Sequence, residues 1–219
     1  PMASAVLVQV TRATASLPIA TALSVESLGY ATLQSGEEFR LWLAESRKTK
    51  KSNKTIQVSN PVVIERKGSA LHLQLNSLEN RNALSTAMRD GLTEAFKLVA
   101  VDASIQRVIV SGNGPCFSAG GDLTEFGSAK DLTMAHHIRQ LRMPAQYLAP
   151  HAARYSFQLH GACIGAGIEL PAFAHHLTAK PDSFFQLPEV GMGLIPGAGG
   201  CVSIPRRIGR HRTNYLAIT

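Results

Sequence analysis

The pattern that most constrains this chain is an alternation of apolar runs and one amphipathic segment between residues 62 and 112. Residues 62–66 and 70–75 are mostly apolar runs separated by Lys67-Gly68, which predicts a β-hairpin. Ser85 is a suitable N-cap for a helix with one apolar face, and residues 107–112 predict another strand. The apolar residues of that helix face are Met88, Leu92, Phe96 and Val99. This alternation predicts an α/β fold in which helices flank a sheet.

The first part of the chain predicts amphipathic helices that need a partner surface. Pro18 begins one segment with apolar residues at helical spacing, and a later segment places Phe39, Trp42 and Leu43 on one face. We therefore expect three regions: a helical segment over residues 1–46, a basic linker over 47–60, and a core over 61–219.

The net charge of +7 does not by itself indicate a nucleic-acid partner. Five positive charges fall in the proposed linker, at Arg47, Lys48, Lys50, Lys51 and Lys54. A charge run of this kind is typical of a solvated linker, and it lacks the interleaved aromatic residues that stack on bases. RNA binding is the alternative for this run, but we do not expect nucleic acid as a partner.

The distribution of apolar residues and cysteines bears on location. No segment reaches the roughly 18 uninterrupted apolar residues of a membrane span, and the N-terminal run AVLV is too short for a signal peptide. Three cysteines without CxxC spacing predict a reducing compartment, and the cytoplasm is the simplest one. The acid-poor residues 1–25 leave a transit peptide as an alternative. The eight histidines show no metal-ligand spacing, so we expect no metal site.

The stretch that carries most chemical information is residues 160–200, which contains Glu169 and Glu189. Glu169 follows GAG and precedes an apolar segment, so we expect it near a helix N-terminus with Pro171 in the first turn. Glu189 is expected in a turn before the glycine-rich loop IPGAGG. Carboxyl groups among apolar side chains have raised pKa values, which suit acid–base catalysis. The alternative interpretation is that Glu169 caps its own helix and that Glu189 is a surface loop residue.

Four motifs together resemble a known family. GAGIEL and QLPEVGMGLIPGAGG follow FSAGGDL at residues 117–123 and RNALS at residues 81–85. In this order and spacing they resemble the crotonase (enoyl-CoA hydratase/isomerase) superfamily over roughly residues 61–219. The resemblance implies a crotonase-like α/β fold of repeated ββα units, a sheet flanked by helices, here with a helical appendage.

The order of segments departs from the family. Residues 16–45 resemble the closing helices of crotonases, which lie at the C-terminal end in that family but come first here. The last residues look like a part of the family after which roughly a hundred more residues normally follow, so the core is expected to be incomplete at its C-terminal side. A rearranged chain, a remnant of a tandem copy and a product cut from a longer chain are all open explanations.

The resemblance implies roles for individual residues. The backbone N–H groups of Ala119 and Ala166 would form an oxyanion hole for a thioester carbonyl. Glu189 would act as the acid–base group at the α-carbon, and Glu169 would orient or deprotonate the water that adds at the β-carbon. Contacts with CoA or substrate are implied for Arg81, Ala83, Gly120, Gly121, Asp122 and Leu123. Alternatively, Asp122 is a helix N-cap and Arg81 a solvated turn residue.

These roles imply a 2-enoyl-CoA hydratase. Its substrate would be an acyl-CoA thioester, with coenzyme A as part of the substrate and no metal or redox cofactor. The family further implies a homotrimer or a dimer of trimers, and we expect no membrane association. Two alternatives are open: another crotonase reaction, such as enoyl-CoA isomerisation or acyl-CoA hydrolysis, and a non-catalytic crotonase-like chain.

Overall fold

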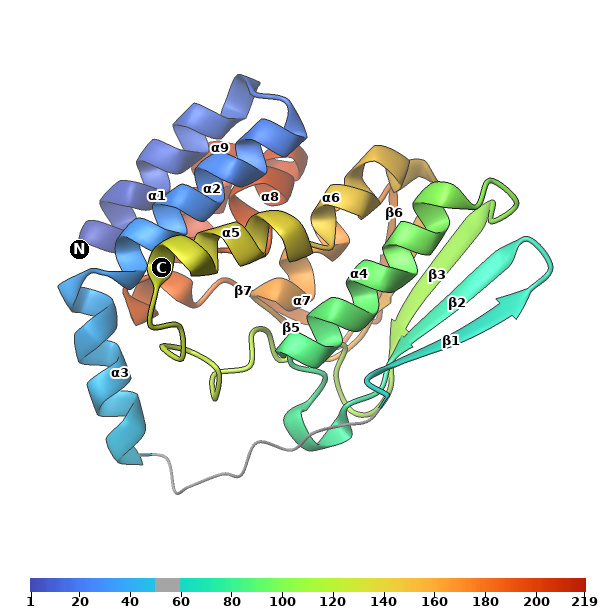
Figure 1. Ribbon diagram of the computed structural model, residues 1–219, viewed down its shortest axis with the longest axis horizontal. Helices are drawn as coiled ribbons and strands as arrows, with labels where there is room; N and C mark the ends of the chain where they lie inside the picture. Colours follow the sequence, from blue (N-terminus) through green and yellow to red (C-terminus); the bar gives the residue numbers. More distant parts are fainter. Residues whose placement is uncertain (50–59) are drawn as a thin grey trace.

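The computed structural model describes residues 1–49 and 60–219, and Figure 1 shows a sheet on one side and a group of helices on the other. A five-stranded sheet has the order β1-β2-β3-β4-β6, and β5 and β7 form a separate two-stranded sheet. Only the β1–β2 pair is antiparallel among the pairs of the larger sheet in the described residues. The strands are β1 (Val62–Lys67), β2 (Ala70–Leu75), β3 (Arg107–Gly112), β4 (Tyr155–Leu159), β5 (Ala162–Ile164), β6 (His176–Ala179) and β7 (Phe184–Gln186).

The described helices lie before, between and after these strands. The α-helices are α1 (Met2–Ala13), α2 (Ile19–Gln34), α3 (Glu37–Thr49), α4 (Thr86–Val101), α5 (Leu132–Arg142), α6 (Ala145–Leu148), α7 (Ala166–Glu169), α8 (Gly200–Ile208) and α9 (Arg210–Ile218). Short 3-10 helices are η1 (Thr14–Ser16), η2 (Leu78–Asn80), η3 (Ala149–Arg154), η4 (Pro171–Phe173) and η5 (Glu189–Met192). The predicted α/β fold is confirmed.

The predicted hairpin and the helix that follows it are confirmed. β1 and β2 pair with Lys67 opposite Ala70, and Gly68 has a positive φ in the turn. Ser85 caps α4, because its hydroxyl oxygen accepts a hydrogen bond of 3.3 Å from the Met88 amide. The predicted apolar face of α4 is buried against the sheet.

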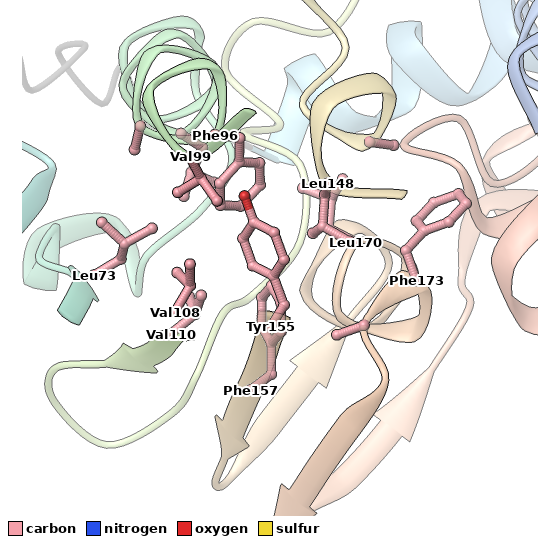
Figure 2. Packing of buried hydrophobic residues seen from close by; sticks show 14 of the residues in the cluster. Leu73, Phe96, Val99, Val108, Val110, Leu148, Tyr155, Phe157, Leu170 and Phe173 are labelled. Atoms are coloured by element: carbon pink, nitrogen blue, oxygen red, sulfur yellow. The ribbon is translucent and has the colours of Figure 1, made fainter. Parts of the chain in front are cut away.

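Figure 2 shows the main core between α4 and the sheet. Phe96 of α4 and Tyr155 of β4 meet edge to face, with ring centroids 5.1 Å apart. Val108 and Val110 of β3 lie beside this pair, and both are fully buried. Burial of each such side chain contributes about 1.5–3 kcal/mol to folding, and this packing fixes the strand ends from which the functional loops emerge.

The N-terminal helices cover their own chain. α1 packs on α8 and α9, and Figure 1 shows these first and last helices side by side although they come from opposite ends of the sequence. Thr14 donates a buried hydrogen bond of 3.0 Å to the Cys201 carbonyl oxygen, and Thr11 donates to Asn214 at 3.1 Å. The helical segment therefore contributes to the same core as the sequence motifs near residue 200.

The end of α3 extends beyond the predicted boundary. The helix continues to Thr49, three residues into the proposed linker of residues 47–60. Glu37 and Glu38 lie in its first turn and Arg47 and Lys48 in its last, a charge distribution that complements the helix dipole and favours the longer helix. The remaining linker prediction, over residues 50–59, lies outside the described residues. None of the helices within residues 1–49 and 60–219 is both long and apolar enough to cross a bilayer.

Candidate active site

Glu169 is placed by a sharp turn from a strand into a short helix. β5 ends at Ile164, and Gly165 then adopts φ +49 and precedes α7, so Glu169 lies in the first turn of that helix. The expected position near a helix N-terminus is confirmed. We expected Pro171 in the first turn of the same helix, and this was wrong. Pro171 begins the separate 3-10 helix η4, because its ring lacks an N–H donor and cannot continue α7.

The Glu169 side chain reaches the beginning of another helix, α8. Its Oε2 atom accepts hydrogen bonds from the amides of Ala198 (2.7 Å) and Gly200 (2.9 Å), and the side chain is only 2% exposed. The loop IPGAGG was expected to bring backbone close to a ligand. In the structure Gly197 and Ala198 of this loop line the cavity described below, and the amides of Ala198 and Gly200 bind the carboxylate of Glu169.

Glu189 lies in η5, so the predicted turn is confirmed. The residue is 9% exposed, and its Oε2 atom is buried without a hydrogen-bond partner in the described structure. The alternative of a surface loop residue is therefore wrong. A buried carboxyl oxygen without a partner is costly in a folded protein, and such atoms are found where a ligand or water binds.

The two glutamates converge at Gly165. A methyl group built on Gly165 would collide with Oε1 of Glu189 and would lie 3.6 Å from Oε1 of Glu169. The carboxyl groups thus share one space, which only a residue without a side chain leaves open. This arrangement places two proton-transfer groups within reach of one small molecule or one carbon centre.

A third buried glutamate, Glu26 of α2, lies at the same place. It is fully buried, and it accepts hydrogen bonds from the amides of Gly199 (2.7 Å) and Cys201 (2.8 Å). Glu26 was not among the residues predicted from the sequence. It could have been identified as a charged residue on the apolar face of a predicted helix, because Ala22, Leu23 and Leu33 of α2 are buried on that face.

Burial dominates the acid–base properties of all three carboxyl groups. It raises the pKa of Glu169 to about 7, against the opposing effect of the two amide hydrogen bonds. It also raises the pKa of Glu189 well above its ordinary range, and the nearby charge of Glu169 adds to this effect. A carboxyl group that titrates near neutral pH can both accept and donate a proton under ordinary conditions.

A cavity of about 520 Å³ opens beside these groups. Both Glu169 and Glu189 line it, together with Ala166, Gly121 and Asp122. Five of its lining residues are therefore among those predicted from the sequence. Other lining residues were not predicted: Tyr30 and Gln34 of α2, Arg139 and Arg142 of α5, Arg89 of α4, and the apolar residues Leu84, Phe126, Met134, Ile138 and Met143.

Four other predicted contact residues do not line this cavity. They are Arg81, Ala83, Gly120 and Leu123, although the segments that carry them lie side by side. The Leu84 amide donates to the Gly120 carbonyl oxygen at 2.7 Å, and Leu84 and Gly121 form a parallel bridge. The side chain of Asp122 accepts hydrogen bonds from the amide and hydroxyl of Thr124, so it caps a turn and not the helix that the alternative interpretation supposed.

The two predicted oxyanion donors differ in their availability. Ala166 is the first residue of α7, where the amide N–H has no intrahelical acceptor, and it lines the cavity. The amide of Ala119 donates to the Arg81 carbonyl oxygen at 3.0 Å. A substrate oxygen can use the Ala119 donor only by displacing that carbonyl or sharing the proton with it. This bond could not be predicted from the sequence, because it depends on the backbone conformation of a distant residue. Arg81 adopts a left-handed conformation, with φ 56°.

The fold agrees with comparisons to known proteins. The family model described as enoyl-CoA hydratase/isomerase matches residues 65–219, which is more than half of the chain. The chain belongs to the enoyl-CoA hydratase/isomerase family, the crotonase superfamily that its motifs resemble.

Relatives with different reactions lie at similar distances. The chain is 33% identical over 164 residues to the mitochondrial Delta(3,5)-Delta(2,4)-dienoyl-CoA isomerase of Rattus norvegicus, covering 68% of this chain and 49% of that protein. It is 30% identical over 158 residues to the 2,3-dehydroadipyl-CoA hydratase of Escherichia coli (strain K12), covering 72% and 61%. The solved enoyl-CoA hydratase of Thermoplasma volcanium superposes with a TM-score of 0.65 at 31% identity, covering 73% and 64%. The chain thus spans about half to three fifths of the length of these curated relatives.

Proposed function

We propose that this chain acts on acyl-CoA thioesters as a 2-enoyl-CoA hydratase, with Glu169 and Glu189 as its acid–base groups. The observation that carries the proposal is their convergence at Gly165, on the wall of a 520 Å³ cavity. Relatives named as hydratases support the substrate class. The unpartnered Oε2 atom of Glu189 supports an acid–base role, since that atom has a free position for a proton in transit.

In the proposed reaction one water molecule is added across the α,β-double bond. Glu169 takes a proton from the water while the water oxygen attacks the β-carbon. The electrons of the double bond move onto the thioester, which becomes an enolate. Glu189 then delivers a proton to the α-carbon. The N–H of Ala166, in the first turn of α7, stabilises the enolate oxygen; Ala119 is the second donor of the proposal once its bond to Arg81 is released.

No metal or redox cofactor is needed for this chemistry, because two carboxyl groups carry the protons and backbone amides stabilise the enolate. The basic side chains on the cavity wall suit the phosphates of the CoA part of the substrate. Arg89, Arg139 and Arg142 line the cavity, and Arg139 has no carboxylate partner within the described residues. The apolar residues of the same wall suit an acyl chain.

The test is hydration of but-2-enoyl-CoA, followed as loss of the absorbance of the conjugated thioester. The wild-type chain is compared with Glu169→Gln and Glu189→Gln, each of which keeps the shape of the side chain but removes its ability to exchange a proton. We expect kcat to fall by roughly 100- to 10,000-fold in both variants. Glu65→Gln, at an exposed position on β1, is the matched control and keeps full activity. A wild-type chain that binds the thioester and never hydrates it would contradict the proposal.

Isomerisation of a 3-enoyl-CoA is the second candidate, and the similarity to the rat dienoyl-CoA isomerase favours it. In that reaction a carboxylate removes a proton from the α-carbon and returns it to the γ-carbon, so no water is consumed. The same cavity would serve, because the oxyanion donors stabilise the same kind of enolate. Supplying a 3-enoyl-CoA distinguishes the two: isomerisation creates the conjugated thioester and raises the absorbance that hydration lowers.

We further propose a homotrimer or a dimer of trimers, located in the cytoplasm. Several large apolar side chains are exposed on the single chain and are suited to contacts between copies. They are Phe184 and Phe185 of β7 and Tyr215, Leu216 and Ile218 of α9. Light scattering on the purified chain tests the assembly; a monomer at micromolar concentration would contradict it.

A further inference from the structure

The beginning of α8 is held by two carboxylates in alternation. Four consecutive amides, those of residues 198 to 201, point at the side chains of Glu26 and Glu169. Glu169 accepts from the first and third, Ala198 and Gly200, and Glu26 accepts from the second and fourth, Gly199 and Cys201, all at 2.7–2.9 Å. Neither carboxylate can move without disturbing the turn that holds the other.

Glu26 comes to this turn from a distant part of the chain. It lies on α2, which packs against α5 and α8, and its side chain has no contact with solvent. The titratable or charged groups that interact with Glu26 are Glu169, Glu189, Tyr30, Arg139 of α5 and Cys201 of α8, and His136 of α5 bonds to the neighbouring Ser27. Among these, Arg139 donates to the hydroxyl oxygen and the carbonyl oxygen of Ser27, next to Glu26, and not to Glu26 itself.

Two negative charges on one short turn interact strongly in a buried setting. Burial raises the pKa of Glu26 well above its ordinary range, and the charge of Glu169 raises it further. The dipole of α8 and the four amides at its start stabilise negative charge there, but Glu26 and Glu169 divide that stabilisation between them. Ionisation of either group therefore makes ionisation of the other less favourable, and Glu26 keeps its proton while Glu169 titrates.

We propose that Glu26 is a positioning residue for Glu169: it fixes the turn that orients Glu169 Oε2, and by keeping its own proton it leaves the negative charge of this turn to Glu169. This inference rests on the proposed function, in which Glu169 accepts a proton from the attacking water. It assigns to the N-terminal helical segment a part in the chemistry, in addition to its packing on the core.

The first experiment measures the pH dependence of kcat for hydration of but-2-enoyl-CoA by the wild type and Glu26→Gln. Glutamine keeps the volume, but it has one acceptor oxygen where Glu26 accepts two amide hydrogen bonds, so the turn that orients Glu169 is disturbed. We expect kcat at its optimum to fall by roughly tenfold to 100-fold with KM nearly unchanged, and the acidic limb to stay in place. A kcat equal to that of the wild type would overturn the inference.

A matched control separates this effect from loosening of α8. Thr14→Val removes the buried hydrogen bond from Thr14 to the Cys201 carbonyl, in the same turn, without changing any charge. It is expected to lower stability and to change kcat much less than Glu26→Gln does. Glu26→Asp serves if the glutamine variant fails to fold: it keeps the carboxyl group but shortens the reach, so kcat should again fall with KM nearly unchanged. An equal loss of kcat in Thr14→Val and Glu26→Asp would also overturn the inference.

A second readout does not depend on turnover. The infrared absorption of protonated carboxyl groups is followed across a pH titration of the full chain, and Glu169→Gln identifies the step that belongs to Glu169. Glu26→Gln identifies the step that belongs to Glu26 in the same way. Glu169→Gln removes the charge that opposes ionisation of Glu26, so the Glu26 step should move to lower pH in that variant. If the wild type hydrates nothing but the Glu26 step moves, the proposed function fails and the link between Glu26 and Glu169 stands. A Glu26 step that stays in place overturns the link, whatever the chain catalyses.

Discussion

The carboxyl groups of Glu169 and Glu189 converge on Gly165, although they belong to different elements, α7 and η5. Gly165 has φ +49, a conformation that side chains disfavour, and a Cβ atom there would collide with Glu189 Oε1. We predict that Gly165→Ala lowers the free energy of unfolding by about 1–3 kcal/mol and reduces activity by roughly 100-fold because it displaces a carboxyl group. Chemical denaturation and the hydration assay measure the two effects.

Gly68→Ala is the control for the backbone part of this prediction. Gly68 also has a positive φ, +60, but it lies in the β1–β2 turn, and a Cβ there meets no atom within 4 Å. It should lose about 1–2 kcal/mol of stability and keep its activity. Equal activity in the two variants would show that the space at Gly165 is not needed by the carboxyl groups.

The three cysteines are predicted to be unreactive in the folded chain. Cys116, Cys163 and Cys201 are free and buried, and burial raises the pKa of Cys163 to about 11 and that of Cys201 well above its ordinary range. Because the thiolate is the reactive form, an aromatic disulfide reagent should react slowly with the native protein and with all three thiols after unfolding. Rapid reaction of one thiol under native conditions would contradict this prediction and would reveal local opening at that cysteine.

Local patterns were sufficient to predict much of the fold. The hairpin of β1 and β2, the Ser85 cap and the buried face of α4 each depend on residues that are neighbours in sequence, and each is confirmed. The positions of Glu169 at the start of a helix and of Glu189 in a turn follow from nearby glycines and prolines, and they are also confirmed.

Features that depend on distant contacts could not be predicted in this way. Glu26 meets Glu169 only after α2 packs on α8, and no local pattern specifies which amides a glutamate will reach. The Ala119 amide is likewise bound by a carbonyl from a different segment, that of Arg81. The glycine-rich loop at residues 195–200 was expected to approach a ligand closely, and Gly197 and Ala198 do line the cavity, but no local pattern showed that Glu169 would bind the amides of Ala198 and Gly200.

Asn82 is predicted to be essential for the loop that carries Ala119. Its side chain is buried; it accepts from the Ser77 amide at 2.8 Å and donates to the carbonyl oxygens of Asn113, Cys116 and Phe117. Asn82→Ala leaves these buried groups without partners and should cost about 3 kcal/mol of unfolding free energy, measured by urea denaturation. Asn80→Ala removes two long, part-buried bonds, one donated to Asp122 and one accepted from the Ala83 amide, and should cost less than about 1 kcal/mol. Similar losses in the two variants would contradict the role of Asn82.

The raised pKa of Glu169 predicts that this group makes folding less favourable as the pH rises. A carboxyl group whose pKa is higher in the folded than in the unfolded state binds its proton more tightly when folded, so its contribution to stability is complete below the unfolded value. For Glu169 that contribution is lost between pH 4.5 and about pH 7, and it amounts to a few kcal/mol. Urea denaturation of the wild type and of Glu169→Gln across this range measures it.

The variant supplies the contrast, because glutamine does not titrate. The difference in unfolding free energy between Glu169→Gln and the wild type should change in favour of the variant as the pH rises from 4.5 to above 7. The same sign is expected for Glu26→Gln, since burial and the charge of Glu169 also raise the pKa of Glu26. A difference that stays constant over this range would mean that Glu169 has the same proton affinity in the folded and the unfolded chain. The effect of its burial would then be offset by its hydrogen bonds from the amides of Ala198 and Gly200.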